Sequence, residues 1–250
     1  MAIALFGVAC GDDGDGGDEG AAAEAAVRAA IQAWNDEDLD GFLSAFTDEG
    51  ITALFAGFSR EEVTEFFSED GVGDPQIEIQ KVHSSEAEGD QATVDFTTIE
   101  GAFQHRQRVT LIKQDDVWLG NDFEPQTQEV PDDTVAVDID LVDYGFEFDR
   151  SQITSGNLAF NISNTGEEPH ELVLSRVPAD LDIEEALQSE EEPEGVEDIG
   201  FAGPWVPGTN LTSILVDELE PGRYVMLCFI PDAEGTPHAL KGMWAEFTVE

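Results

Sequence analysis

The sequence predicts two domains, an α+β domain followed by an all-β sandwich. The chain has 250 residues, enough for two domains that each bury a hydrophobic core. Helical apolar spacing is confined to the first part of the chain, and alternating strand patterns dominate afterwards. The polar segment Glu124–Asp133, which contains two prolines, separates the two sets of strands. We therefore expect an N-terminal domain at residues 21–126, a linker at 127–133 and a C-terminal domain at 134–250.

The N-terminal domain begins with helical patterns. Residues 21–34 are rich in alanine and place Trp34 on an apolar face, and residues 39–46 repeat the helical spacing. Ser59 and Glu62 have the spacing of a capping box, so a further helix is expected from there through Phe67. The short apolar run 51–55 between these helices is expected to be a strand.

Four strands are expected after these helices. Each run alternates or is rich in β-branched residues, and glycine and aspartate pairs separate the runs as hairpin turns. Their ranges are 76–83, 91–99, 103–113 and 117–123. Helices followed by consecutive antiparallel strands indicate an α+β fold.

Details of this region resemble the family of nuclear transport factor 2 and the SnoaL-like polyketide cyclases. The matching residues are Trp34, Asp38-Leu39-Asp40, Phe46-Thr47-Asp48 and Val117-Trp118, together with the capped helix. The resemblance implies a cone in which a curved, cystatin-like sheet wraps around a helix and leaves an apolar pocket. It also implies a ligand-binding role, an enzyme that uses an Asp or His inside the cone, or a dimer through this domain.

Asp95 and His105 are the candidate catalytic residues of such a cone. They lie on successive expected strands joined by a hairpin, so they are expected to face each other across it. The alternative is that both are solvated or structural, since Asp95 alternates with Thr93 and Thr97 on the more polar face.

The C-terminal domain is expected to be an antiparallel sandwich of about seven strands. Alternating or apolar runs identify the strands. The pattern fails between Asp180 and Gly208, where a short helix at 181–188 and an irregular segment at 201–207 are expected. The expected strands lie at 134–142, around 146–148, within 153–162, and at 170–177, 209–216, 223–230 and 244–249.

The loop from Cys228 to Met243 carries the chemistry of this domain. It supplies a thiol, the imidazole of His238 and a thioether, and a second imidazole, His170, opens another expected strand. Two imidazoles, one thiolate and a weak axial thioether form the ligand set of a blue-copper site, which suits electron transfer. Zinc held by the thiolate and two imidazoles is an alternative. So is a metal-free domain in which the cysteine and methionine are simply core residues.

Residues from about 131 to 250 resemble the cupredoxins, the family of plastocyanin and azurin. The matching motifs are Asn164-Thr-Gly-Glu-Glu-Pro-His170-Glu-Leu and Pro221-Gly-Arg-Tyr224, followed by Cys228, His238 and Met243. The resemblance implies a Greek-key sandwich holding one type 1 copper, with His170, Cys228 and His238 as equatorial ligands and Met243 as the axial ligand. Nine residues separate the cysteine from the second histidine, and Glu171 stands where many members have an asparagine that bonds back to the ligand loop.

The charge of the chain is strongly acidic. Ten basic residues stand against 56 acidic residues, which gives a net charge of −46, and only Lys81, Lys113 and Lys241 are lysines. Such a surface is typical of proteins from salt-loving organisms, and it disfavours nucleic acid and anionic membrane surfaces as partners. We expect a redox partner protein with a cationic docking patch. The alternative is that the charge is only a solubility and salt adaptation.

The first twenty residues resemble the end of a bacterial lipoprotein signal followed by a tether. An apolar run ends in small residues before Cys10, and residues 11–20 are only Gly, Asp and Glu. The resemblance implies lipidation at Cys10 and an exported protein anchored to the membrane, in the periplasm or at the cell surface. The alternative is a disordered N-terminus with an incidental cysteine.

Three functions follow from these features. The first is an extracytoplasmic type 1 copper protein that carries single electrons, with the N-terminal domain used for ligand binding or association. The second is a copper-binding or delivery protein without redox turnover. The third is a SnoaL-like small-molecule-binding domain or enzyme with an accessory, metal-free sandwich. A multicopper oxidase is excluded, because the chain has no paired His-x-His motif.

Overall fold

A computed structural model describes residues 15–70, 75–154, 156–189 and 193–250. Cys10 and the lipoprotein-like residues before it lie outside these ranges, so their expected roles stay predictions. Among the described residues, no helix combines the length and the apolar character needed to cross a bilayer.

Four helices open the N-terminal half. The sequence prediction holds for three of them, and the capping box is present, since the Ser59 N–H donates to the Glu62 carboxylate at 2.8 Å. The prediction of a strand at 51–55 is wrong: Thr47 caps a helix there by accepting the Gly50 N–H at 2.9 Å, and Ile51 is fully buried among the helices. The four are α1 (Asp15–Asn35), α2 (Leu39–Ser44), α3 (Asp48–Leu54) and α4 (Arg60–Asp70).

Residues 15–20, which were expected to belong to an acidic tether, are helical instead, because α1 begins at Asp15. Glu19 accepts hydrogen bonds from the Lys113 ammonium at 2.8 Å and from the Trp118 indole at 3.2 Å, which fix this end of the helix to the sheet. Long-range contacts therefore override the low apolar content of the Gly/Asp run.

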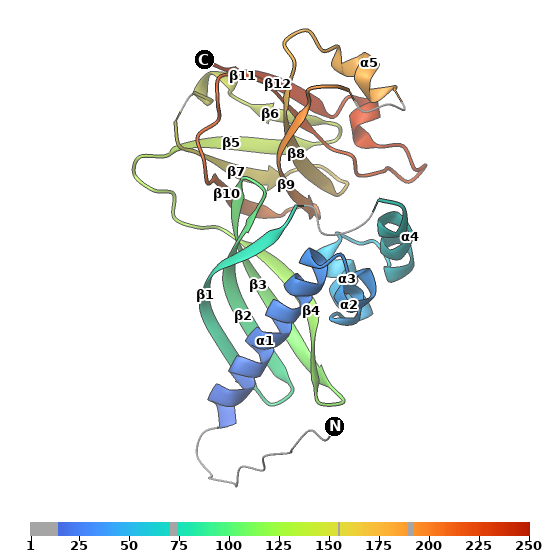
Figure 1. Cartoon of the computed structure of the whole chain (residues 1–250), viewed down its shortest axis with the longest axis vertical. Coiled ribbons are helices and arrows are strands. Elements are labelled where there is room, and N and C mark those ends of the chain that lie inside the picture. The colour runs from blue at the N-terminus through green and yellow to red at the C-terminus, as the bar shows by residue number, and fades with distance from the viewer. Residues whose placement is uncertain (1–14, 71–74, 155, 190–192) are drawn as a thin grey trace, which may run out of the picture.

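The first four strands form an antiparallel sheet against which α1 packs, as Figure 1 shows. Each strand pairs with the next, and bulges in the β1–β2 and β3–β4 pairs accompany its curvature. Apolar side chains such as Val94 and Phe96 meet Ala23 and Val27 of the helix. The strands are β1 (Ile77–Glu88), β2 (Gln91–Glu100), β3 (Phe103–Gln114) and β4 (Val117–Gln126), so the α+β architecture is confirmed.

The C-terminal half consists of two layers of strands around one core. One layer has the order β10-β7-β5-β6 and the other β12-β11-β8-β9. The core between them includes Phe160, Leu172 and Tyr224, each at most 1% exposed. The strands are β5 (Val135–Val142), β6 (Gly145–Phe148), β7 (Leu158–Asn164), β8 (His170–Val177), β9 (Glu197–Trp205), β10 (Asn210–Leu215), β11 (Gly222–Leu227) and β12 (Trp244–Val249).

Two expectations for this half need correction. Strands β5 and β7 run parallel, so the sheets are not wholly antiparallel. Residues 197–205, part of which was expected to be irregular, form β9, which adds to the edge of β8. The expected short helix is present as α5 (Ile183–Leu187), and two 3-10 turns, η1 (Arg150–Gln152) and η2 (His238–Lys241), complete the described elements.

The two halves share one sheet. Gln104 and Phe103 of β3 pair with Ile214 and Leu215 of β10, which joins the N-terminal sheet to one layer of the sandwich. Phe103 is fully buried in the core of the C-terminal half. Within the connecting segment, Gln128 donates to the carbonyls of Gln104 and Thr212, so the linker is fixed to both halves.

Candidate metal centre

The hairpin of β11 and β12 brings three of the four expected metal ligands together. Cys228 follows β11 directly, His238 opens η2, and Met243 precedes β12. Backbone bonds hold the loop in place: the His238 N–H donates to the Ile230 carbonyl at 2.9 Å, and the Met243 N–H donates to the His238 carbonyl at 3.0 Å. His170 opens β8, the other neighbour of β11.

The side chains of His170, Cys228 and His238 converge. Their ligand atoms all lie within 4.8 Å of one another. The two Nδ1 atoms are 3.1 Å apart, and the Cys228 Sγ is 3.5 Å from the His238 Nδ1. Metal bonds of about 2.0 Å to nitrogen and about 2.3 Å to sulfur, spread at roughly 120°, place such atoms about 3.5–3.7 Å apart. The donor set therefore fits one metal ion, and Met243 is fully buried in the same core as Cys228.

Carboxylates fix the orientation of both imidazoles. The Nε2 atom of His170 lies 2.8 Å from an Asp143 oxygen, and that of His238 lies 2.9 Å from a Glu168 oxygen. An ionised carboxylate only accepts, so each Nε2 donates to its carboxylate and each Nδ1 is the ring nitrogen that faces the other imidazole. Two facing ring nitrogens beside a sulfur can be bridged by one cation, and carboxylates behind histidine ligands are common at metal sites.

The pKa values of these groups follow from their surroundings. Burial lowers the pKa of His238, and so does the neighbouring His170. For Asp143, burial acts to raise the pKa, but the Glu167 N–H and the His170 imidazole outweigh it and hold it below the ordinary value. The Asp143 carboxylate is therefore ionised at neutral pH, as the hydrogen bond to His170 requires.

Tyr144 and Lys241 cover the Glu168 side of the centre. The Tyr144 ring lies edge-on to the His238 imidazole at 4.9 Å, and its hydroxyl donates to Glu168 at 3.0 Å. The Lys241 ammonium donates to that hydroxyl at 2.7 Å and to Asp232 at 2.6 Å. This chain of contacts keeps His238 fully buried.

Glu171 connects the strand of His170 to the ligand loop. One of its carboxylate oxygens accepts the Phe229 N–H at 2.7 Å, directly after Cys228. Burial raises the pKa of this carboxyl to about 7. Glu171 thus ties the first residues of β8 to the loop that carries Cys228.

The sequence analysis did not find Asp143, Tyr144, Glu168 or Lys241. All four are common surface residue types, and three of them lie in turns or loops. The only local signal was that Glu168 stands two residues before His170. Their convergence depends on how β5, β8 and η2 meet, which no local pattern encodes.

Asn164 anchors the segment that leads to His170, and its replacement tests that role. The buried amide donates to the carbonyls of Glu168 at 3.0 Å and Trp205 at 2.8 Å, and it accepts the Gly166 N–H at 3.1 Å. We expect Asn164→Ala to lower the free energy of unfolding by about 2–3 kcal/mol, because buried backbone groups lose their partners. Denaturant unfolding measures the loss. The exposed Asn210→Ala serves as control, at about 0.5 kcal/mol or less, and equal losses would contradict the anchoring role.

The structure does not bring Asp95 and His105 together, which corrects the expected pairing. Asp95 pairs in register with Arg108 and His105 with Thr98, so their side chains lie on opposite faces of the sheet. Asp95 is held by Arg106 at 2.8 Å and by Arg108 at 3.2 Å. His105 is buried, with its Nδ1 atom 3.1 Å from the Ser213 hydroxyl. Hydrogen bonds to Arg106 lower the pKa of Asp95, as expected for a structural ion pair rather than a proton acceptor.

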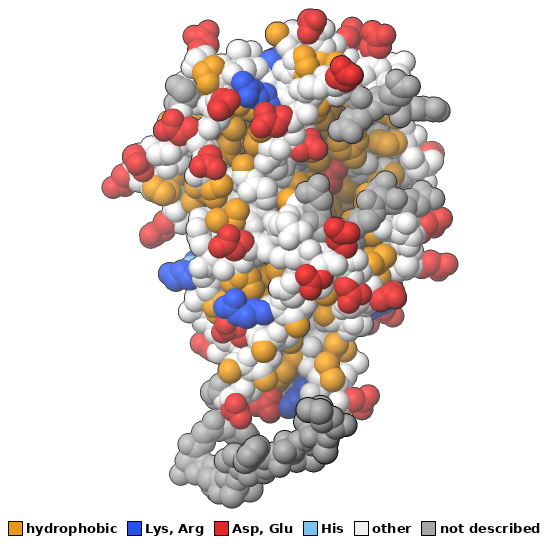
Figure 2. Space-filling view, in the orientation of Figure 1, with side chains coloured by type: hydrophobic (Ala, Val, Ile, Leu, Met, Phe, Trp, Pro, Cys, Tyr) orange, Lys and Arg blue, Asp and Glu red, His pale blue; other side chains and the backbone are white. Residues whose placement is uncertain are grey.

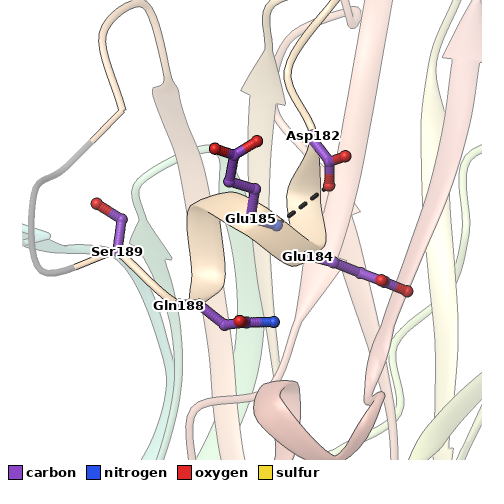
Figure 3. A pocket seen from close by; sticks show the side chains of 5 residues that line it. All are labelled: Asp182, Glu184, Glu185, Gln188 and Ser189. Carbon is purple, nitrogen blue, oxygen red and sulfur yellow. Dashed lines mark hydrogen bonds between the residues drawn. The ribbon is translucent and has the colours of Figure 1, made fainter.

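A surface hollow at α5 carries no comparable chemistry. Figure 3 shows its lining side chains, Asp182, Glu184, Glu185, Gln188 and Ser189, spread around a helix of five residues. The Asp182 carboxylate accepts the Glu185 N–H at 3.1 Å and so serves as the helix cap.

No protein-family model matches the chain, and no curated protein matches it significantly. Among solved structures, an NTF2-like protein of unknown function from Shewanella baltica OS155 is 14% identical, with a TM-score of 0.34, and the match covers 45% of this chain and 96% of that one. A putative ketosteroid isomerase from Kribbella flavida DSM 17836 is 15% identical, with a TM-score of 0.29, over 44% of this chain and 83% of that one.

A third structure, Lac15 from a marine microbial metagenome, is 13% identical, with a TM-score of 0.22, and the match covers 70% of this chain and 50% of that one. The first two are similarities of fold over just under half of this chain, the first of them to an NTF2-like protein. At TM-scores below 0.5, none of the three decides an activity, a ligand or a metal for this protein.

Proposed function

We propose that this chain is a type 1 copper protein that carries single electrons, with a cupredoxin-like C-terminal domain. The observation that carries the proposal is the convergence of two imidazole nitrogens and one sulfur within 4.8 Å, beside a buried methionine. His170, Cys228 and His238 would hold the ion, with Met243 as the weak axial ligand. Copper bound there would supply a Cu(II)/Cu(I) couple.

The surrounding residues keep this ligand set rigid. The three ligands of the hairpin are tied by backbone hydrogen bonds, and His170 is held by β-pairing to β9 and by Asp143. Thiolate and thioether ligands suit Cu(I), whereas imidazole suits both oxidation states. Because the scaffold fixes the positions of this mixed ligand set, little rearrangement would accompany the gain or loss of an electron.

A delivery protein that hands copper to a partner is less well supported. His170, Cys228, His238 and Met243 are all 0% exposed. Metal transfer between proteins requires an incoming ligand to reach the ion, whereas an electron crosses a thin layer of protein. The burial of all four side chains therefore favours electron transfer over metal transfer.

The surface charge supports the kind of partner expected from the sequence. On the face shown in Figure 2, acidic side chains are spread over both halves and basic ones are few. A redox partner with a cationic docking patch would be attracted to such a surface. Export and lipid anchoring through Cys10, and a dimer through the N-terminal half, remain parts of the proposal.

An optical spectrum of the copper-loaded protein tests this function. We expect an intense absorption in the orange to red region, which disappears on reduction and returns on oxidation, because the thiolate donates charge to Cu(II). Cys228→Ser removes the thiolate and should abolish the band. Cys10→Ser is the matched control and should leave the band unchanged. Stoichiometric copper without this colour, or a band that persists in Cys228→Ser, would contradict the proposal.

A further inference from the structure

A large cavity lies between part of the N-terminal half and part of the C-terminal sandwich. Its volume is about 1280 Å³, and residues of both halves line it. Typical small-molecule sites have volumes of roughly 300–1,000 Å³, so the cavity has room for an organic ligand.

Apolar side chains dominate the walls of this cavity, and many of them are aromatic. Aromatic residues come from α1, α4 and the end of α3 on one side and from β9 and the ligand loop on the other. Two of them are also exposed large apolar side chains: Phe66 is 59% exposed and Phe229 is 46% exposed. Exposed apolar side chains gathered around a cavity mark a binding site more often than a plain surface. Aromatic lining residues from the two sides include Trp34, Phe55, Phe66, Phe201, Trp205 and Phe229.

The charge of the lining is negative. Among the described residues that line the cavity, six are Asp or Glu and Arg106 is the one Lys or Arg. Arg106 is already paired with Asp95 at 2.8 Å, and the lining carboxylate of Asp232 is paired with Lys241 at 2.6 Å. Burial raises the pKa of the Glu171 carboxyl to about 7, so the charge rests mainly on the other four acidic residues, Glu62, Glu65, Glu100 and Asp198. The chain as a whole carries −46, so its long-range potential has the same sign as that of the lining. Anionic molecules are repelled from the cavity and cations are attracted to it.

The cavity also reaches the candidate metal centre. Phe229 and Glu171 line it, and they are the residues that follow Cys228 and His170 in sequence. Trp205, another lining residue, pairs with His170 in the sheet. A molecule bound in the cavity would therefore contact the immediate neighbours of two metal ligands.

We propose that this cavity binds an organic cation, one whose positive group is attached to an aromatic ring. Aromatic faces attract cations through the ring quadrupole, and the surrounding carboxylates add a Coulomb attraction, so the two features of the lining select the same kind of ligand. The proposal goes beyond the metal centre and does not depend on it.

Three probes of equal ring size and different charge test the selectivity. They are the N,N,N-trimethyl-2-naphthylammonium cation, its uncharged isostere 2-tert-butylnaphthalene, and the 2-naphthalenesulfonate anion, each measured with the full chain by equilibrium dialysis. We expect the cation to bind about fivefold or more tightly than the isostere, and the anion about tenfold more weakly. Added salt should reduce both differences. Equal affinities for cation and isostere, or no saturable binding, would overturn the proposal.

Two pairs of variants locate the site. Phe66→Ala should weaken all three probes about threefold or more by removing apolar wall, whereas Val117→Ala, at an equally exposed position that does not line the cavity, should change nothing. Glu65→Gln should weaken only the cation, and its neighbour Glu61→Gln, which does not line the cavity, should not. Equal effects within either pair would overturn the assignment.

The same measurements in Cys228→Ser separate this proposal from the copper function. The order of probe affinities should persist without the thiolate, because Cys228 does not line the cavity. Loss of colour with retained cation selectivity would leave the cavity proposal standing alone. Normal colour without selectivity would remove the cavity proposal and leave the copper function intact.

Discussion

Replacement of Phe103 by alanine is expected to lower the free energy of unfolding by about 3–5 kcal/mol. The ring belongs to β3 of the N-terminal half but is fully buried in the core of the C-terminal half, where its centroid lies 6.0 Å from that of Phe160. A Cβ added at Gly200 would lie 2.7 Å from the Phe103 ring, so the backbone of β9 packs directly on it. Truncation of this ring to a methyl group leaves a cavity between β3, β9 and β10, because the paired strands cannot move together enough to fill it. Denaturant unfolding at constant slope measures the loss.

The position of Phe103 also predicts that the two halves unfold together. The ring is part of the β3–β10 connection, so its loss should weaken amide protection in α1 as well as in β11. Phe66→Ala is the matched control: its ring is 59% exposed, and its truncation should cost about 0.5 kcal/mol or less. A Phe103→Ala loss as small as that of the control, or protection lost in only one half, would contradict the coupling.

The sequence pattern correctly predicted those helices and strands whose structure depends mainly on their own residues. Strands β2 and β4 and the helix capped by Ser59 formed where alternation and the capping box predicted them. Residues 51–55 were misassigned because a short apolar run fits a strand and a buried helix equally well. Strand β9 was missed because Gly200, Gly203 and Pro204 have low strand propensity. Antiparallel pairing with β8 stabilises it as a strand despite that low propensity.

The residues of the candidate site also divide into those that the sequence predicts and those that only the packing brings together. His170, Cys228, His238 and Met243 were identified because their chemistry is rare and their spacing matches a known ligand set. The carboxylates behind them were not, because Asp143 and Glu168 reach the imidazoles only through the packing of separate turns. Asp95 and His105 failed as a pair because the β2–β3 register fixes which faces they occupy, and turn residues 101–102 set that register.

Binding of a divalent metal ion is expected to release one proton per ion at pH 8.5. Burial raises the pKa of the Cys228 thiol to about 12, and the nearby Glu171 charge acts in the same direction. The metal-free thiol is therefore protonated at pH 7, whereas the ligand form is the thiolate. Because the free protein holds one proton more than the bound protein, affinity should rise with pH. The expected slope is about tenfold per pH unit from pH 8 to pH 10, above the pKa of about 7 of Glu171.

Calorimetric titration counts these protons directly when it is repeated in buffers of different ionisation enthalpy. Zn(II) is the metal used, because it has no redox chemistry. The titration is made at pH 8.5, where Glu171, with a pKa of about 7, is already ionised. His238 does not add to the count there, since burial holds the pKa of its imidazole below the ordinary value. Cys228→Ser should bind more weakly, release no proton and lose the pH slope. A proton count near zero in the unmodified chain would mean that the sulfur is not a ligand. The two imidazoles would then have to hold the ion without it, which leaves a site unsuited to the copper function.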